Sequence, residues 1–340
     1  MFSWQVFKMK IEQLCIQYGL GNLTKEPQPV SGGFMHQMYH VTTNKGEYAV
    51  KMLNPDIMKR PEALQNMINS ELVSNALKDR IPLVAAKEFQ GMHILELDGV
   101  YFVIFDWVNG RSVFAPDITA YHCEQMGRLL GKIHTSKIRV ESVSKQDRGR
   151  SLYDWDKLLE EAEQKNTECY LLLKEYLTDI RRWDKQVVEA WQTIAQIRVI
   201  SHGDLDPKNV LWKDNNPYII DWEAAGYVNP YQELVEVLNY WIVEEDGQYN
   251  QEKFIALFQA YRENADLQDV DWSMVLSSSF DGMRGWLEYN VKRAIGLEGT
   301  SAQDEQEGMQ HTQGTLKELK RYEAQMELLQ KWIETGGEWK

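Results

Sequence analysis

The chain has 340 residues, a formal net charge of −14 and 43% hydrophobic residues. This length allows about two domains or one bilobed unit, and the composition is that of a folded globular protein. The acidic balance argues against nucleic acid as a main partner, because phosphate binding needs a basic surface.

Membrane insertion and secretion are not expected. The longest strictly hydrophobic run, Val100–Phe105, is far shorter than a membrane-spanning helix. Charged residues in the first twelve positions interrupt any apolar signal segment. Three cysteines without paired spacing favour neither a disulfide framework nor a zinc site. We therefore expect a cytoplasmic protein with no membrane partner.

The first hundred residues are typical of strands. A turn at Asn44-Lys45-Gly46 joins two of them into a predicted hairpin. Pro61 opens a predicted helix that runs to about Asp79. Alternating or continuous apolar runs predict the strands 36–44, 47–53, 92–97 and 99–108.

Helical patterns dominate after Asn109-Gly110, interrupted by the short strand pair NVLW and PYIID. The predicted helices cover about 119–136, 152–177, 180–197, 231–243, 251–264, 272–295 and 313–336. The sequence thus predicts an α+β architecture with a strand-rich lobe, residues 1–108, and a mainly helical lobe, residues 109–340. A ligand cleft is expected where the lobes join.

The strongest functional pattern is the segment SHGDLDPKN, which is followed by the strand pair and by IIDWE. Asp204 and Asn209 stand in the first segment, and Asp221 comes directly after the strand pair. Phosphoryl transfer needs a carboxylate that orients the attacking hydroxyl, and an amide oxygen and a second carboxylate that hold Mg²⁺. The order and spacing of these residues predict Asp204 as the catalytic residue and Asn209 and Asp221 as metal ligands.

These segments resemble the aminoglycoside phosphotransferase and choline kinase-like family, which are small-molecule relatives of the protein kinases. HGDLDPKNVLW is similar to the family's catalytic loop and IIDWE to its metal-binding segment, and the resemblance runs from about Val30 to Asn239. It implies a bilobal protein kinase-like fold. It also implies a kinase that transfers the γ-phosphoryl group of ATP or GTP, with Mg²⁺, to a hydroxyl of an aminoglycoside or another amino alcohol or sugar.

Two upstream residues fit this resemblance. Lys51 stands on a predicted strand in an A-V-K context, like the phosphate-binding lysine of the kinases. Glu71 lies on the apolar face of the predicted helix, where an unpaired carboxylate is costly. We therefore expect Glu71 to pair with Lys51 and to turn it toward the nucleotide phosphates.

Two further nucleotide contacts are implied by the resemblance. Ser31, Gly32 and Gly33 match the family's short glycine-containing loop, in which backbone amides approach phosphate oxygens. The chain at Phe105, Asp106 and Val108 forms the join between the lobes, where kinase-like folds hydrogen-bond the base.

Other positions are assigned structural roles or depart from the family. His202 is expected to pack the catalytic loop, and His134 to end a helix with a polar partner. Lys208 stands where many relatives carry a small residue, and it either approaches a phosphate or reaches solvent. Glu233 replaces the usual aspartate of a downstream segment, so we expect it to do the same structural work.

The acceptor side offers a weaker pattern. Residues 241–310 hold 14 acidic and 5 basic residues, which make either a solvated face or a wall that attracts a cation. The candidate wall residues are Glu244, Glu245, Asp246, Asp281 and Glu288. Asp281 and Glu288 share one helical face and are the predicted acceptor-binding residues. Trp286 and Tyr289 flank them, and either stack on the acceptor or pack in the core.

A catalytically silent kinase-like binding or structural protein, such as a spore-coat component, is the alternative function. The complete set of Lys51, Glu71, Asp204, Asn209 and Asp221 favours catalysis, because a silent protein has no physical need to keep all five. The sequence shows no recognisable activation loop after IIDWE, which argues against protein substrates.

Overall fold

A computed structural model describes residues 4–30, 36–147, 149–267, 269–299 and 301–336. The chain forms two compact units. Unit 1 comprises residues 1–114, 136–144 and 200–226, and unit 2 comprises residues 115–135, 145–199 and 227–340. The segment with the predicted catalytic and metal-binding residues therefore belongs to the same unit as the N-terminal strands. The lobe boundary after residue 108 stays a prediction, and unit 1 extends beyond it, to residue 114 and to residues 136–144 and 200–226.

Unit 1 is built on a five-stranded antiparallel sheet with the order β1-β2-β3-β5-β4. The hairpin predicted from the sequence is present, with Thr43 opposite Gly46 at its turn. The four strands expected from the sequence are confirmed as β2 to β5. The strands are β1 (Gln28–Val30), β2 (Gln37–Thr43), β3 (Gly46–Met52), β4 (Ile94–Leu97) and β5 (Val100–Asp106).

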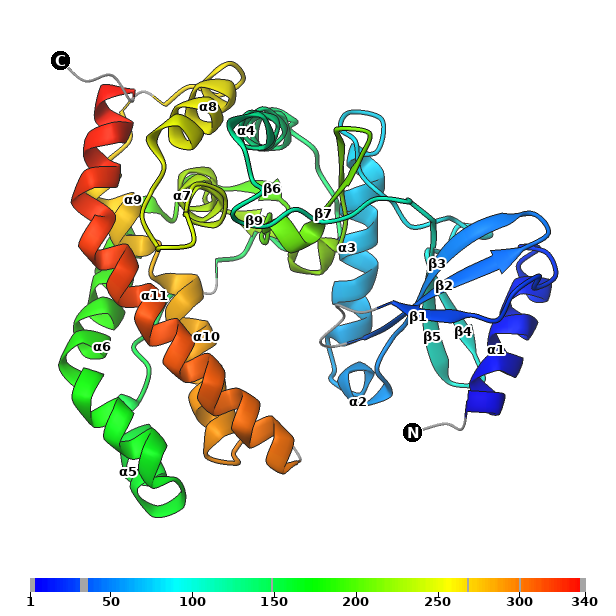
Figure 1. The fold of residues 1–340 in the computed structure, drawn as a ribbon, viewed down its shortest axis with the longest axis horizontal. Helices are drawn as coiled ribbons and strands as arrows, with labels where there is room; N and C mark the ends of the chain where they lie inside the picture. Colours follow the sequence, from blue (N-terminus) through cyan, green and yellow to red (C-terminus); the bar gives the residue numbers. More distant parts are fainter. Residues whose placement is uncertain (1–3, 31–35, 148, 268, 300, 337–340) are drawn as a thin grey trace. The chain divides into compact units, whose positions relative to one another are not determined.

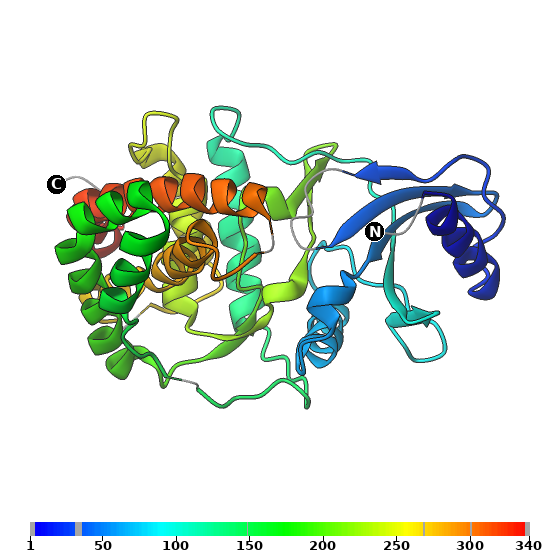
Figure 2. The same cartoon turned by 90° about the horizontal axis from the view of Figure 1, so that it is seen from below.

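Each face of this sheet has its own apolar cluster, because successive strand residues point to opposite faces. On one face, α1 (Trp4–Gln17) buries Ile11 and Leu14 against Val50 and Phe102. On the other, Met67 of α3 (Ala63–Leu77) belongs to a cluster with Val103. Figures 1 and 2 show α1, in dark blue, beside the strands. The short helix α2 (Pro55–Met58) links β3 to α3.

The predicted strand pair of the catalytic segment is confirmed as β7 (Val210–Lys213) and β8 (Asn216–Ile219). Asp214 and Asn215 form the turn with φ values of 49° and 62°, the conformation that a tight hairpin turn requires. The backbone N–H of Val84 donates to the carbonyl oxygen of Ile219 at 2.9 Å. This bond ties the hairpin to the chain that follows α3.

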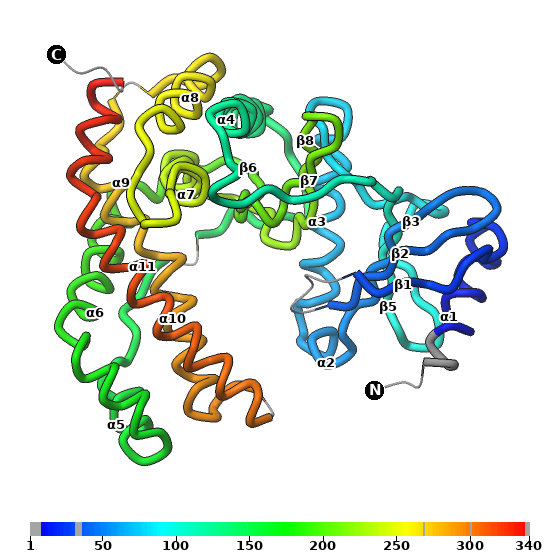
Figure 3. The backbone as a smooth tube through the Cα atoms, in the orientation of Figure 1, coloured from blue at the N-terminus to red at the C-terminus, as the bar shows by residue number. Residues whose placement is uncertain are grey.

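Unit 2 is mainly helical. Its helices are α4 (Ala120–Thr135), α5 (Trp155–Lys165), α6 (Thr167–Ile194), α7 (Pro230–Trp241), α8 (Gln251–Arg262), α9 (Trp272–Ser278), α10 (Asp281–Ala294) and α11 (Ala302–Thr335). Figure 3 traces α10 alongside α11. The strands β6 (Val199–Ser201) and β9 (Gly226–Val228) lie where the chain passes between the units. None of the helices in the described residues is both long and apolar enough to cross a membrane.

Several helix boundaries differ from the sequence expectation. The predicted helices 152–177 and 180–197 are divided near residue 178, whereas the structure divides them at Asn166, whose side chain accepts the backbone N–H of Cys169 and so begins α6. The predicted helix 272–295 is two helices, α9 and α10. The last helix begins earlier than predicted, where Ser301 caps it, and α1 was not expected.

Candidate active site

Asp204 and Asn209 are joined within one short loop of unit 1. Pro207–Asn209 forms the 3-10 helix η1, which carries the Asn209 side chain back toward the start of the loop. The Nδ2 atom of Asn209 donates to the backbone oxygen of Asp204 at 2.8 Å and to its Oδ2 atom at 3.0 Å. These bonds orient both side chains and do not use the amide oxygen of Asn209.

His202 connects this loop to the segment that carries Asp221. Its ring is buried, and its Nε2 atom lies 3.0 Å from the backbone oxygen of Ile220. The backbone N–H of Asp204 donates to its Nδ1 atom at 3.2 Å, and the ring packs edge-on against Trp222. Both ring nitrogens therefore hold backbone groups, which is the structural role expected from the sequence.

Gly203 brings the two segments into close contact. Its φ is 78°, and a Cβ atom added there would lie 2.5 Å from the backbone oxygen of Ala224, in the 3-10 helix η2 (Trp222–Ala224). Only glycine meets both conditions without a shift of the backbone. The catalytic loop and the IIDWE segment are thus packed directly on one another.

Lys51 lies on β3 and is buried, with its ammonium among carboxylates. Its Nζ atom is 3.1 Å from Oδ1 of Asp221 and also contacts Oε1 of Glu223. Burial alone would lower the pKa of Lys51, but the two carboxylates outweigh it and raise that pKa. Asp221 has a left-handed backbone, with φ of 58°, which turns its side chain at the end of β8.

Glu71 does not form the ion pair with Lys51 that the sequence led us to expect, as far as the described residues show. Its carboxylate is buried and instead accepts the hydroxyl of Ser74 at 3.3 Å and the backbone N–H of Ala86. Burial raises the pKa of Glu71 to about 7, and these hydrogen bonds and the charge of Lys51 offset only part of this effect. Asp221 and Glu223 contact the ammonium group of Lys51, so the lysine pairs with them and not with Glu71.

The oxygen atoms of this cluster suit Mg²⁺. The carboxylates of Asp221 and Glu223 converge on one cation, the ammonium of Lys51. The described residues contain no group of three or more His, Cys, Asp or Glu side chains arranged for a metal ion. Magnesium commonly takes one or two carboxylates together with substrate phosphates, so a set of Asp221, Glu223 and the Asn209 amide fits it.

Glu223 and His36 belong to this cluster, although the sequence did not point to their contact. The Nε2 atom of His36 lies 3.5 Å from Oε2 of Glu223. Burial alone would raise the pKa of Glu223, but His36 and Lys51 hold it at about 2. The one sequence signal for Glu223 is its place two residues after Asp221.

The other predicted nucleotide-binding residues are only partly described. Ser31, Gly32 and Gly33 lie outside the described residues. Phe105 and Asp106 end β5 and pair with β3, and the Asp106 carboxylate accepts Lys87 at 2.6 Å. Val108 lies two residues after Asp106, and its carbonyl accepts the N–H of Gly110 at 2.9 Å. Their contact with a nucleotide base stays a prediction.

Lys208 lies beside the predicted catalytic carboxylate. Its Nζ atom is 3.2 Å from Oδ2 of Asp204 and 3.7 Å from Oδ2 of Asp206. Burial would lower the pKa of this lysine, but Asp204 and Asp206 raise it. The Lys208 side chain thus lies beside carboxylates of the site and is also 54% exposed, and its approach to a phosphate stays a prediction.

In unit 2, His134 and Glu233, which the sequence assigned separate structural roles, contact each other. The Nε2 atom of His134 lies 2.6 Å from Oε2 of Glu233, and its Nδ1 atom lies 2.8 Å from the hydroxyl of Tyr261. All three side chains are buried. This contact joins α4, α7 and α8 through polar groups that burial would otherwise make costly.

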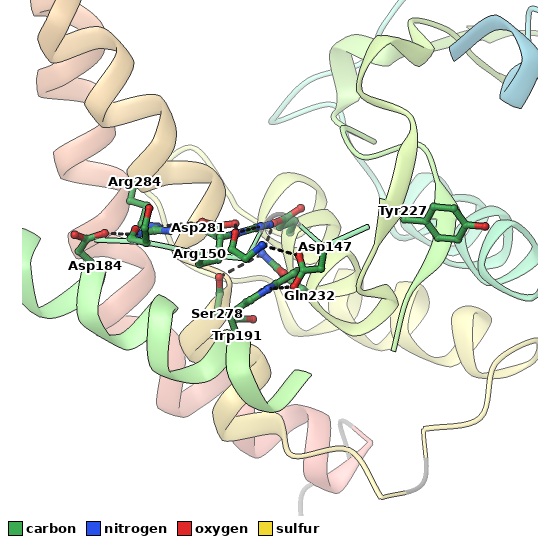
Figure 4. Close-up of polar contacts among 12 residues, drawn as sticks. Asp147, Arg150, Asp184, Trp191, Tyr227, Gln232, Ser278, Asp281 and Arg284 are labelled. Atoms are coloured by element: carbon green, nitrogen blue, oxygen red, sulfur yellow. Dashed lines mark hydrogen bonds and ion pairs between the residues drawn. The ribbon is translucent and has the colours of Figure 1, made fainter. Parts of the chain in front are cut away.

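The predicted acceptor residues of unit 2 are paired with cations. Figure 4 shows Asp281 between Arg150 and Arg284, and Arg284 reaching Asp184. The Nη2 atom of Arg284 is 3.0 Å from Oδ1 of Asp281, whose side chain is 15% exposed. Glu288 contacts Lys292 one turn further along α10. These pairs reduce the negative potential expected at both positions, and their contact with an acceptor stays a prediction.

One further wall residue is paired with a cation, and the two aromatic residues that flank the wall are exposed. Glu244 also has a cationic partner, Lys253, at 2.8 Å. Trp286 and Tyr289 stack on each other with ring centroids 5.6 Å apart, and they are 46% and 36% exposed. The two rings therefore lie at the surface and not in the core.

A comparison with known protein families shows the family to which the chain belongs. Residues 26–267 match the model of the phosphotransferase enzyme family. The chain belongs to this family. The match includes Lys51, Glu71 and the whole catalytic segment, and it ends before α10.

The curated relatives of this phosphotransferase are bacterial kinases. Stress response kinase A of Salmonella choleraesuis is 26% identical over 203 residues, which cover 58% of each chain. The protein of Escherichia coli K12 with the same name is 25% identical over 235 residues, or 68% of this chain and 67% of the relative. A Salmonella typhimurium relative, also 26% identical, is named serine/threonine protein kinase RdoA. The chain spans little more than half the length of the Salmonella proteins.

Solved structures show that the phosphotransferase has a protein kinase-like fold. Spectinomycin phosphotransferase with ADP and spectinomycin has a TM-score of 0.69 at 14% identity, covering 93% of this chain and 98% of that one. Amicoumacin kinase with AMP-PNP and Ca²⁺ has a TM-score of 0.63 at 15% identity, covering 92% and 93%. Choline kinase of Cryptosporidium parvum has a TM-score of 0.56 at 15% identity, covering 96% and 99%.

Proposed function

We propose that this phosphotransferase transfers the γ-phosphoryl group of ATP or GTP to a hydroxyl group of a small molecule. The observation that carries the proposal is the arrangement in unit 1, where Asn209 orients the Asp204 carboxylate and Lys51 lies with Asp221 and Glu223. Transfer of this kind needs positioning and charge stabilisation more than covalent chemistry by the protein. Family membership supports the same reaction class.

Each residue has one task in this mechanism. Asp204 orients the acceptor hydroxyl and takes its proton as the oxygen bonds to the γ-phosphorus and the bond to the bridging oxygen breaks. Lys51 leaves its carboxylates and binds phosphate oxygens of the nucleotide. Asn209 and Asp221, with Glu223 beside them, would hold Mg²⁺. When bound there, Mg²⁺ neutralises charge on the phosphates.

An amino alcohol, aminoglycoside or sugar is the proposed acceptor class. The names of the structural relatives include kinases and phosphotransferases for spectinomycin, amicoumacin and choline, which supports a small hydroxyl compound. The paired carboxylates on α10 give less support to a strongly cationic wall than the sequence alone did. A cationic acceptor therefore remains one branch of the test.

The test is a screen of nucleotide consumption with ATP and with GTP, Mg²⁺, and panels of amino alcohols, aminoglycosides, sugars and a serine-containing protein. We expect turnover with a small hydroxyl compound and none with Asp204→Asn. Phosphorylation of the protein alone would replace the acceptor class and keep the chemistry. Nucleotide binding without turnover on any panel would favour the silent binding or structural protein.

A further inference from the structure

His36 is a buried histidine for which the catalytic scheme has no role. It is the first described residue after positions 31–35 and directly precedes β2. The backbone N–H of Asn54 donates to its Nδ1 atom at 3.0 Å. In a neutral imidazole, one nitrogen accepts and the other carries the proton. The proton of neutral His36 is therefore on Nε2.

The Nε2 atom lies near one oxygen of a carboxylate that also contacts Lys51. Oε2 of Glu223 lies 3.5 Å from Nε2, while Oε1 of the same carboxylate contacts the lysine. A closed N–H···O hydrogen bond is about 2.7–3.2 Å long, so the contact with His36 is stretched. Glu223 thus lies between two nitrogen groups, one near each of its oxygens.

The proposed function changes this balance. Lys51 must release Glu223 when it binds nucleotide phosphates, and Glu223 then keeps one side-chain donor among the contacts described here, His36. The anchor of His36 is a backbone N–H at the start of α2, directly after the strand that carries Lys51. Because a backbone group fixes the His36 ring, this ring can keep the Glu223 carboxylate in place after the flexible Lys51 side chain has left it.

We propose that His36 is a positioning residue that fixes the Glu223 carboxylate beside Asp221 for the metal–nucleotide complex. This inference rests on the proposed function. Removing a residue that orients a metal ligand through a hydrogen bond lowers metal affinity or activity about 10–100-fold. His36 contacts neither acceptor nor phosphate in this scheme, and acts through Glu223.

The experiment is calorimetric titration of ATP and of GTP into the full chain, with excess Mg²⁺ and again with EDTA. The variants are His36→Leu, His36→Gln, Glu223→Gln and the double variant His36→Leu/Glu223→Gln. His93→Leu is the matched control, because His93 is another histidine of unit 1 that makes no contact with the Lys51–Glu223 pair among the described residues. Unfolding midpoints are measured for every variant.

We expect His36→Leu to weaken Mg-nucleotide binding about 10-fold or more and to leave binding in EDTA within two-fold. His36→Gln should recover most of the loss, because its amide can accept from Asn54 and donate to Glu223. The double variant should be no weaker than Glu223→Gln alone, since His36 acts through that carboxylate. The control should bind like the wild type.

Equal losses with and without Mg²⁺, or additive losses in the double variant, would overturn the role of His36 alone. A wild-type chain that binds neither Mg-nucleotide would overturn the proposed function and this inference together. If His36→Leu does not fold, His36→Asn decides, because its shorter amide can still accept from the Asn54 N–H but falls short of Glu223. Wild-type Mg-nucleotide affinity in that variant would also overturn the proposal.

Discussion

Replacing Glu71 by glutamine is expected to stabilise the protein above neutral pH. Burial raises the pKa of Glu71 to about 7, whereas the same group in an unfolded chain has its ordinary value of 4.5. The folded state therefore holds this proton more tightly than the unfolded state does. The free energy of unfolding falls as the pH rises from 4.5 to 7 and then levels off.

The magnitude follows from the size of the shift. One pKa unit corresponds to about 1.4 kcal/mol, so an ionised Glu71 costs roughly 3 kcal/mol at pH 8. Glutamine has nearly the same shape, carries no charge, and can still accept the N–H of Ala86 and bond to Ser74. The substitution should thus remove the cost at pH 8 and change little at pH 4, where the carboxyl is already protonated.

Urea unfolding at pH 4, 6 and 8 measures this difference for the wild type and Glu71→Gln. Glu88→Gln, an exposed carboxylate of the same unit, is the control and should show no such pH dependence. A stabilisation that does not grow with pH would refute the reasoning. So would a less stable Glu71→Gln at pH 8, because it would mean that Lys51 or another cation pairs with Glu71 in solution.

Four further substitutions test the site and its supports. Asp204→Asn should lower turnover by about 10²–10⁴ with nucleotide affinity changed a few-fold at most, and a kinase assay beside calorimetry separates the two. Asp221→Asn should remove most Mg²⁺-dependent nucleotide binding, whereas unchanged metal dependence would place the metal elsewhere. Gly203→Ala should destabilise by about 2–4 kcal/mol in thermal unfolding, because φ is 78° and the carbonyl of Ala224 blocks the Cβ; wild-type stability would mean that this contact is loose. Asp281→Asn should lower the unfolding temperature, because it holds a buried arginine; an unchanged temperature with a changed acceptor KM would restore it as an acceptor ligand.

The strand pair in the segment of Asp204, Asn209 and Asp221 was predictable because its information is local. Asp204, Asn209 and Asp221 lie close together in the sequence, and the turn at Asp214-Asn215 folds the chain back between them. Turn chemistry and residue type over such a short stretch limit the conformations available. The strand that carries Lys51 was predictable for a similar reason, since its hairpin is formed by neighbouring residues.

The partners of Lys51 could not be predicted in the same way. Glu71 stands on the next long helix after the strand of Lys51, whereas Asp221 and Glu223 come only in the second half of the chain. All three are carboxylates of suitable reach, and the sequence does not rank them by distance in space. The contact of His36 with Glu223 has the same character, because it joins segments that only the folded unit brings together.

The pairs on α10 are a different case, because the sequence contains their signal. Asp281 and Arg284 are three residues apart and Glu288 and Lys292 four, the spacings at which charges on a helix meet. A count of the acidic residues of 241–310 that ignores these neighbouring cations overstates the negative electrostatic potential of the segment. The missed α1 is similar, since Ile11, Leu14 and Cys15 have the spacing of a helix face.

The chemistry of this enzyme can be tested before its acceptor is known. The residues proposed for the nucleotide and the metal, Lys51, Asn209 and Asp221, all belong to unit 1, whereas Asp281 and Glu288 belong to unit 2. Substitutions in the first set act on binding of Mg-nucleotide or on hydrolysis of the nucleotide, and neither readout needs an acceptor. If the unit 1 variants lose Mg-nucleotide binding or nucleotide hydrolysis and the α10 variants keep both, the nucleotide chemistry lies in unit 1, whatever the acceptor is. If the α10 variants lose these functions and the unit 1 variants keep them, the proposed site in unit 1 is wrong.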